Sequence, residues 1–504
     1  MSIVNGINNS NGHVDLEAKM EPDIEEEKRR ERKGVVYQII MALCANSSVL
    51  GPSMAFGYSA VALGPLMSET SDVQIDKTQA NWIATATALG IPLGCILSSY
   101  TMRCGRKVSL LITSVVSILG WIVIYMAGTY KQILVGRIIS GIATGSASVP
   151  ATVYSAEVAS PKWRATMVTW TSVSIAIGVL IVYIFGYVFK DDWRMVALMC
   201  ALFPLVSATL TLAIVPETPI WLRDRGRLDE ALQVSKKFHG IPKDASPPAH
   251  VYDQLTQRPQ KKKQNLLKHL LKRNAMLPFA IMLAYFFFQQ FSGIFVVVYY
   301  AVDIIENAGI TIDPYLGAVL IGFTRFVGSV LVACLSGRFG RRIPSIVSGA
   351  GMTIFMGVLS IYLLTEDRGY TMRDGGFVPV ICVLMYIFSS TLGFLVIPFA
   401  MVGEVYPTKV KEVLTGLTTC IAYIFSSITV KTYPDMEVAL GRYGVFMFFT
   451  VLSFFGTLFV FFFLPETKGK TLTEIVEMFS KNGKAADRLE KERMMDLKDV
   501  SAAA

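Results

Sequence analysis

The chain has 504 residues, of which 53% are hydrophobic and only 17% are charged, and its formal net charge is +9. A soluble domain with so little charge could not cover its own surface, so the composition favours a membrane protein. The basic residues flank apolar runs and do not line one face, so the positive charge indicates membrane topology and argues against a nucleic-acid partner.

Apolar segments follow one another along the chain, each about 20 residues long, which is the length a helix needs to cross roughly 30 Å of hydrocarbon. We predict twelve spans, at residues 35–60, 78–100, 107–128, 132–154, 166–189, 193–215, 275–300, 314–336, 343–364, 377–401, 412–431 and 442–464. The predicted fold class is an all-α membrane protein with twelve transmembrane helices in two pseudo-symmetric six-helix halves.

The predicted organisation has five parts. These are a disordered cytosolic N-terminal tail (1–34), an N-terminal six-helix half (35–215), a cytosolic helical linker (216–274), a C-terminal six-helix half (275–464) and a cytosolic C-terminal tail (465–504). Within the linker, residues 227–238 and 265–274 have the apolar spacing of short amphipathic helices. Most Lys and Arg residues lie in the tails and in the loops after the even-numbered spans, so both termini are predicted to be cytosolic.

Three short phrases occur twice, about half the chain length apart. They are Gly105-Arg106-Lys107 and Gly340-Arg341-Arg342, Glu157 with Arg164 and Glu404 with Lys411, and Pro216-Glu217-Thr218 and Pro465-Glu466-Thr467. A repeat of this length indicates a duplicated structural unit, as in transporters built from two related halves.

Arginine and carboxylate side chains form planar ion pairs that can join helices, so we predict that the repeated charges latch the cytosolic side shut. The predicted gating residues are Arg106, Glu157, Arg164, Glu217, Arg341, Glu404, Lys411 and Glu466. The alternative is that these residues only set the membrane topology, since a single surface ion pair contributes little.

A longer ordered set of motifs covers residues 35–475. It comprises Phe56-Gly57-Tyr58, Arg137-x-x-x-Gly141-x-x-x-Gly145, Tyr154-x-x-Glu157, Pro216-Glu217-Thr218-Pro219, Gln289-Gln290-Phe291-Ser292-Gly293-Ile294, Tyr299-Tyr300, Pro398 with Glu404 and Pro407, and Pro465-Glu466-Thr467-Lys468-Gly469. This set resembles the sugar porter family of the major facilitator superfamily, and within it the insect facilitated trehalose transporters. The resemblance implies a central cavity near the midplane and alternating access.

Two adjacent glutamines match the family's sugar-contacting phrase, and their amides carry both donors and acceptors for sugar hydroxyls. Phe295 and Arg325 stand where the family usually has asparagine, so the polar lining departs from the family's pattern. The predicted substrate-binding residues are Gln289, Gln290, Phe295, Tyr299, Arg325, Thr391, Phe399, Tyr423, Ser426 and Ser172. The alternative for each aromatic residue is helix packing or an interfacial belt.

Proton coupling usually requires a carboxylate or a histidine deep in the membrane. No Asp or Glu lies in the middle of a predicted span, all four histidines lie in predicted cytosolic segments, and Ser59 occupies the position where proton-coupled family members carry an acid. We therefore expect facilitated, downhill transport. No nucleophile–base set, metal-ligand spacing or phosphate loop is present, so we expect no enzymatic activity, no cofactor and no metal.

Arg325 is predicted to lie close to the midplane, where a charge is costly unless it faces water or a partner. It either lines the cavity or is a structural arginine that bonds backbone carbonyls or reaches Asp303 or Glu306. The leading hypothesis is a facilitative plasma-membrane carrier for trehalose or a hexose, monomeric by default. The alternatives are a transporter-like sugar sensor with little flux, and a carrier of the same fold for a non-sugar solute such as an anion.

Overall fold

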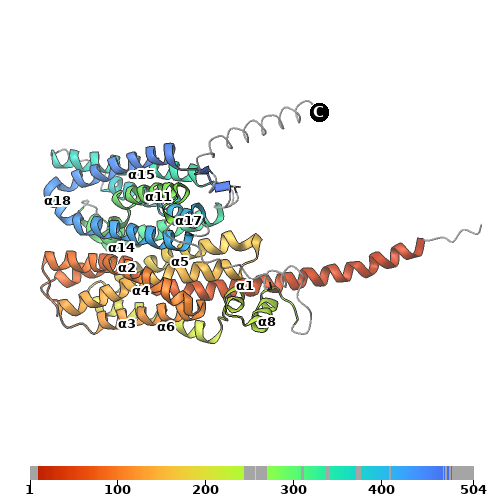
Figure 1. The fold of residues 1–504 in the computed structure, drawn as a ribbon. Helices are drawn as coiled ribbons and strands as arrows, with labels where there is room; N and C mark the ends of the chain where they lie inside the picture. Colours follow the sequence, from red (N-terminus) through yellow and green to blue (C-terminus); the bar gives the residue numbers. More distant parts are fainter. Residues whose placement is uncertain are drawn as a thin grey trace, which may run out of the picture.

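The computed structural model describes residues 10–242, 256, 269–307, 312–335, 340–369, 376–407, 410–468, 470, 474, 475, 478 and 479. Their regular structure is helical. The helices form two bundles that lie one over the other (Figure 1).

The first bundle contains the N-terminal half. Its helices are α1 (Ser10–Met67), α2 (Lys77–Cys104), α3 (Arg106–Tyr125), α4 (Tyr130–Val158), α5 (Pro161–Val188), α6 (Trp193–Ala213), α7 (Pro219–Asp224) and α8 (Leu228–Phe238). Helix α8 confirms the amphipathic helix predicted at 227–238, and it buries Ala231, Ser235 and Phe238. The other helix predicted in the linker, at 265–274, lies mainly outside the described residues.

The second bundle contains the C-terminal half. Its helices are α11 (Arg273–Phe291), α12 (Ile294–Tyr299), α13 (Ala301–Asn307), α14 (Pro314–Leu335), α15 (Arg342–Asp367), α16 (Phe377–Leu392), α17 (Ile397–Val405) and α18 (Lys411–Phe463). Eleven helices of the described residues are long and apolar enough to cross a membrane. Helix α18 counts as one of them, but Gly441, with φ 71°, breaks it into two crossings. The twelve-span prediction is therefore confirmed.

Two predicted spans are not continuous helices, which corrects our expectation. The seventh span breaks at Gly293, whose φ of 89° lies in the left-handed region, and continues as α12. The tenth span breaks between α16 and α17, at residues 393–396. Hydropathy reads only the length of an apolar run, so it does not detect an interruption inside one.

The N-terminal tail also differs from the prediction. Residues 10–34, expected to be disordered, continue α1 as helix. Residues 25–33 are rich in Glu, Lys and Arg, which are good helix formers, and the following span supplies a ready helical nucleus. Most of the predicted C-terminal tail (465–504) lies outside the described residues.

Local sequence signals explain several helix starts. Asp76 accepts a hydrogen bond from the N–H of Gln79 at 2.7 Å, and the Gln79 amide oxygen accepts from the N–H of Asp76 at 3.3 Å, which forms a capping box at α2. Helices α5 and α7 begin at Pro161 and Pro219, where the missing proline N–H costs nothing.

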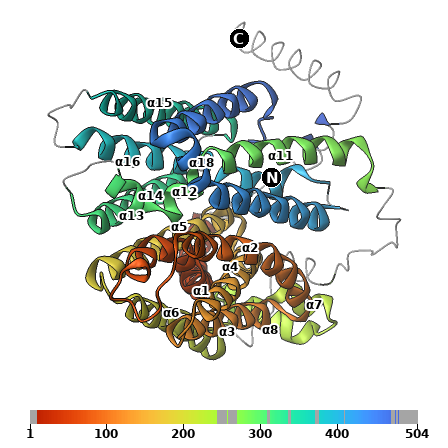
Figure 2. The same ribbon diagram turned by 90° about the vertical axis from the view of Figure 1, so that its left-hand side faces the viewer.

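The two bundles meet along two helix pairs. Helix α2 packs against α18, and α5 packs against α14. Figure 2, turned by 90° from Figure 1, shows α1–α6 grouped on one side of this junction and α11–α18 on the other. We call the end of the molecule that carries Gly105–Lys107, Glu157 and Glu217 with their repeats the motif end. The opposite end, with residues 68–76, 189–192 and 432–441, is the loop end.

Candidate functional site

The two adjacent glutamines lie at the end of α11, beside both helix breaks, and both are fully buried. Gln289 donates through Nε2 to the carbonyl oxygens of Phe394 and Leu395, at 2.6 and 3.1 Å. These carbonyls belong to the α16–α17 break, where the helix does not use them. Gln290 donates to the Oε1 atom of Gln289 at 3.2 Å, and its own Oε1 has no partner among the described residues. Gln289 thus stabilises the break and orients Gln290, which keeps a free acceptor.

Arg325 of α14 lies at the junction of the halves and is 5% exposed. Its Nη1 atom has no hydrogen-bond partner among the described residues, and neither Asp303 nor Glu306 pairs with it. Tyr183, Tyr299 and Tyr423 are the tyrosines within electrostatic range of its guanidinium group. These tyrosines come from α5, α12 and α18, so both halves surround Arg325.

Two of these tyrosines differ in their bonding. Tyr183 donates from its hydroxyl to the carbonyl of Val298 at 2.7 Å and so ties α5 to α12. The hydroxyl of Tyr299 is buried and has no partner among the described residues. Tyr183 was missed in the sequence analysis, although a tyrosine in the middle of a span (166–189) is a signal for a buried polar contact.

Each nitrogen of the second buried arginine has a neutral hydrogen-bond partner. Arg137 of α4 donates to the carbonyl oxygens of Ala55 and Ile83, at 3.0 and 3.4 Å, and to the hydroxyl of Ser59. Its guanidinium carbon lies 5.3 Å from the ring centre of Tyr58. The side-chain oxygen that Arg137 bonds is therefore a serine hydroxyl, which does not titrate.

The remaining predicted pocket residues have mixed surroundings. Phe399 lies between Phe286 and Tyr423, with ring centres 4.9 and 6.0 Å away. Thr391 donates to the Ile387 carbonyl of its own helix at 2.8 Å. The hydroxyl of Thr391 is thus already used within α16. Ser426 is buried on α18, and Ser172 is half-buried on α5.

Polar contacts between the halves gather at the loop end. Asn81 of α2 donates to the Lys431 carbonyl of α18 at 3.1 Å and accepts from the Tyr300 hydroxyl at 3.4 Å. Lys190 pairs with Asp313 across the halves, and this hydrogen-bonded ion pair holds the pKa of Asp313 below its usual value.

An aromatic contact lies deeper at the same junction. The ring of Phe56 on α1 lies 5.7 Å from that of Phe295 and 6.1 Å from that of Tyr299, measured between ring centres. Both partner rings belong to α12, the segment after the break in the seventh span. The halves are therefore in contact from the loop end inward to Phe56.

At the motif end, the repeated phrases meet within each half. Arg106 pairs with Glu157 at 2.7 Å, and Thr218 donates to the other oxygen of Glu157 at 2.5 Å. In the second half, Arg341 pairs with Glu404 at 2.7 Å, and Thr467 donates to Glu404 at 2.9 Å. The repeat in the sequence therefore corresponds to a repeated network of side chains. In each half an arginine pairs with a glutamate, and a threonine donates to the same glutamate.

The Pro-Glu-Thr phrase, at residues 216–218 and 465–467, supplies a glutamate that caps a helix in each half. Glu217 accepts from the N–H groups of Arg106 and Lys107 at the start of α3 (2.9 and 3.2 Å), and Glu466 accepts from those of Arg341 and Arg342 near the start of α15 (2.9 and 3.1 Å). A carboxylate is favourable at a helix N-terminus. A Cβ at Gly105 would lie only 2.5 Å from a Glu217 oxygen, which explains the glycine that opens the phrase.

The two capping carboxylates titrate differently. Burial raises the pKa of Glu217, and the N–H groups that it accepts from oppose this shift without cancelling it. Burial acts in the same direction on Glu466, but the N–H groups of Arg341, Lys468 and Arg342 outweigh it and lower its pKa. The difference follows from the deeper burial of Glu217.

Two predicted gating residues stand apart from these networks. Arg164 is exposed and Lys411 is half-buried, and neither forms an ion pair with a residue that the structure describes. The six other predicted gating residues bond within their own half. A latch between the halves stays a prediction.

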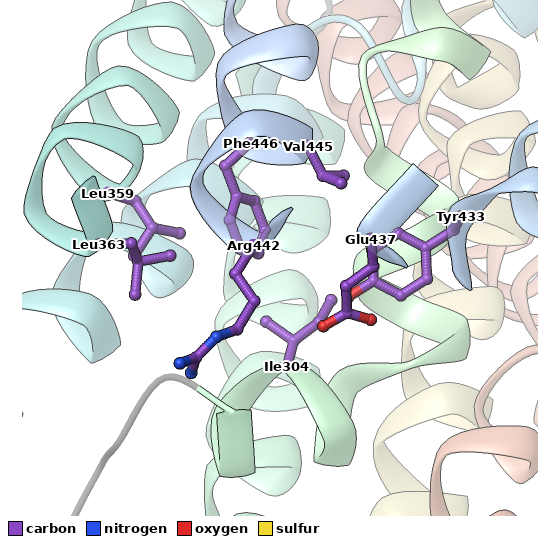
Figure 3. A pocket seen from close by; sticks show the side chains of 8 residues that line it. All are labelled: Ile304, Leu359, Leu363, Tyr433, Glu437, Arg442, Val445 and Phe446. Atoms are coloured by element: carbon purple, nitrogen blue, oxygen red, sulfur yellow. The ribbon is translucent and has the colours of Figure 1, made fainter. Parts of the chain in front are cut away.

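A hollow at the loop end is a different kind of site. Figure 3 shows its lining by Ile304, Leu359, Leu363, Tyr433, Glu437, Arg442, Val445 and Phe446. These residues come from α13, α15 and α18, all in the C-terminal half. The hollow does not lie at the junction of the halves, so movement of one half against the other would not expose it alternately to the two sides.

Two six-helix bundles around a buried polar junction define the class: the fold is that of the major facilitator superfamily. Residues 44–479 match the family described as sugar (and other) transporter, so the chain belongs to this family and is a multi-pass membrane transporter. The resemblance inferred from the motifs is confirmed.

Relatives and solved structures agree with this assignment. The facilitated trehalose transporter Tret1 of Polypedilum vanderplanki is 30% identical over 445 residues, 88% of each chain. The Tret1-2 homolog of Drosophila simulans is 30% identical over 87% of this chain and 90% of its own, whereas the Tret1 of Drosophila pseudoobscura pseudoobscura is matched over only 50% of its length. The xylose transporter XylE from E. coli in its inward-open conformation superposes with a TM-score of 0.71, at 21% identity, over 88% of this chain and 100% of that chain.

Proposed function

We propose that this protein is a facilitative carrier that moves a sugar across the membrane by alternating access. The observation that supports this most is a set of three buried polar atoms, on Gln290 beside the helix breaks and on Tyr299 and Arg325 at the junction of the halves, that have no partner among the described residues. Buried polar atoms normally have partners, so these three support a site for a polar solute. The breaks in the seventh and tenth spans lie beside Gln290, as in transporters whose sites are built at helix breaks.

The proposed orientation places the motif end in the cytosol and the carrier in the plasma membrane. The basic residues of the tails and linker support this orientation. Because the contacts between the halves gather at the loop end, the structure then corresponds to a state closed toward the outside. The name of the Tret1 relatives supports trehalose as a candidate substrate.

Uncoupled transport is supported by the partner of Arg137. Related proteins differ in mechanism, since Tret1 is a facilitated trehalose transporter and XylE is a proton:xylose symporter. In this chain Arg137 bonds the hydroxyl of Ser59, which cannot carry a proton between the two sides. Proton-coupled carriers use ionisable side chains within the membrane as proton relays.

We expect purified protein in liposomes to equilibrate labelled trehalose or glucose without accumulating it, because the side-chain partner of Arg137 is a serine hydroxyl that does not titrate. An inward proton gradient is expected to change the initial rate by less than twofold. The Ser59→Asp variant places a carboxylate beside Arg137 and is expected to make the rate depend on pH, because a carboxylate titrates and the serine hydroxyl does not. Accumulation driven by the gradient in the unmodified protein would refute uncoupled transport, and binding without flux would favour a sensor.

The two glutamines are expected to respond differently to replacement. Gln289→Leu leaves the buried carbonyls of Phe394 and Leu395 without a donor and is expected to cost about 1–3 kcal/mol of stability. Gln290→Leu removes the free acceptor and also the donor to the Oε1 atom of Gln289, so we expect a loss of stability of about 1 kcal/mol, smaller than for Gln289→Leu, and an affinity about 3- to 10-fold weaker. Thermal unfolding and solute binding on the same samples separate the two effects. Equal loss of stability in both variants would show that Gln290 is structural.

A further inference from the structure

Two arginines are buried in the protein, Arg325 at the junction of the halves and Arg137 among α1, α2 and α4 of the N-terminal half. Arg137 and Arg325 are 0% and 5% exposed, and neither forms an ion pair with a residue that the structure describes. Two carbonyls and a hydroxyl accept one hydrogen bond from each nitrogen of Arg137, but they do not neutralise its charge. A buried charge without a counter-charge is costly in a low-dielectric environment.

Arg325 differs from Arg137 because it still has a free donor. Its Nη1 atom is buried and has no partner in the described part of the chain, and the same holds for the hydroxyl of Tyr299. The Tyr299 hydroxyl lies within electrostatic range of both guanidinium groups. The site formed by Arg325 and Tyr299 therefore has two unused hydrogen-bond donors. The electrostatic potential there is made positive by the charges of Arg137 and Arg325.

A neutral sugar would satisfy the free hydrogen-bond donors of this site but not its positive charge. Its hydroxyls can accept from Arg325 and Tyr299, but the two positive charges would remain uncompensated. A carboxylate accepts from a guanidinium group in a charge-assisted, often bidentate bond and also neutralises the charge. The remaining sugar hydroxyls would then face the free acceptor of Gln290 and the tyrosine ring faces.

We propose that Arg325 binds the carboxylate of an acidic sugar, so that a hexuronate is a preferred substrate over the corresponding neutral hexose. This inference rests on the proposed carrier function and narrows its substrate class. The carboxylate accepts from the free Nη1 atom of Arg325 and from the hydroxyl of Tyr299.

Binding by the full-length protein tests the proposal independently of flux. D-glucuronate and D-glucose form a matched pair, because they share the same ring and differ only in a carboxylate for a CH₂OH group. We expect the unmodified protein to bind glucuronate at least tenfold more tightly, measured by ligand-induced thermal shift in detergent. Arg325→Gln is expected to abolish this preference, because glucuronate affinity should fall at least tenfold more than glucose affinity, and Arg325→Lys, which keeps the charge but loses the planar fork, to retain part of it.

The control is Arg227→Gln, which removes an exposed arginine of the linker and should leave the preference intact. If glucuronate binds no better than glucose to the unmodified protein, or if Arg325→Gln and Arg325→Lys both leave the preference unchanged, the proposal is wrong. Glucose flux without any glucuronate binding would overturn the hexuronate proposal but would still support the proposed carrier function. Glucuronate binding without flux of either sugar would uphold the site and overturn the carrier.

Membrane potential supplies a second readout in liposomes. An uncoupled carrier of a monoanion moves one charge per cycle, and one charge across 100 mV corresponds to about a fifty-fold concentration ratio at equilibrium. We therefore expect a potential set by valinomycin and potassium, positive inside, to drive glucuronate accumulation and leave glucose at its equilibrium level. Glucuronate uptake that ignores the potential would contradict its movement as a free anion.

Discussion

Gly145→Ala is expected to destabilise the N-terminal half by about 2–4 kcal/mol, because two helix backbones touch at this residue. A methyl group there would overlap the carbonyl oxygen of Ile91 on α2. Gly94 makes the reciprocal contact with the Ile142 carbonyl on α4. The two helices must separate to accept the side chain, and neither backbone can move without disturbing its other neighbours.

The control for this prediction is Gly416→Ala on α18. A Cβ at Gly416 would have no neighbour within 4 Å, so the change should stabilise the helix slightly, by up to about 1 kcal/mol. Thermal unfolding of the two variants in the same detergent measures the contrast, which is expected to be opposite in sign. Equal midpoints would mean that α2 and α4 relax without cost.

Glu157→Gln is expected to lower transport at least tenfold and to reduce stability by about 1–3 kcal/mol. The carboxylate accepts from both Arg106 and Thr218, and the side chains of Glu157 and Arg106 are only 12% and 19% exposed. Its loss leaves the Arg106 charge partly buried without compensation. The variant would also remove the charged link between α4 and the start of α3 at the motif end.

A matched control is available in an exposed ion pair of the linker. Arg227 and Glu230 are 52% and 51% exposed, so Glu230→Gln should change stability by less than about 0.5 kcal/mol and leave transport unchanged. Glu404→Gln tests the repeat, since its partner Arg341 occupies the same place in the second half. If Glu157→Gln and Glu230→Gln have the same transport rates and thermal midpoints, the network has no role in transport or stability. Its charges would then serve only to set the membrane topology.

Much of the fold was predictable because a membrane constrains the sequence locally. Each crossing needs its own run of apolar residues, so twelve spans and the duplication of two halves follow from hydropathy and from the repeated phrases. Arg106 and Glu157 were predicted as partners in a charged network, and the structure pairs them at 2.7 Å. Their pairing inside one half, and not between halves, was not predictable, because both arrangements use the same residues.

The candidate site was harder to predict, because the sequence does not show which of several possible partners a polar side chain bonds. Gln289 and Gln290 are adjacent and chemically identical, yet one bonds the broken tenth span while the other keeps a free oxygen. The surroundings of Arg325 likewise combine residues from α5, α12 and α18. The apolar runs and the repeat determined the number of spans and their grouping without reference to any contact. Only the tertiary structure decided which buried polar atoms are used and which stay free, because partners separated by more than a hundred residues in the chain become neighbours only when the helices pack.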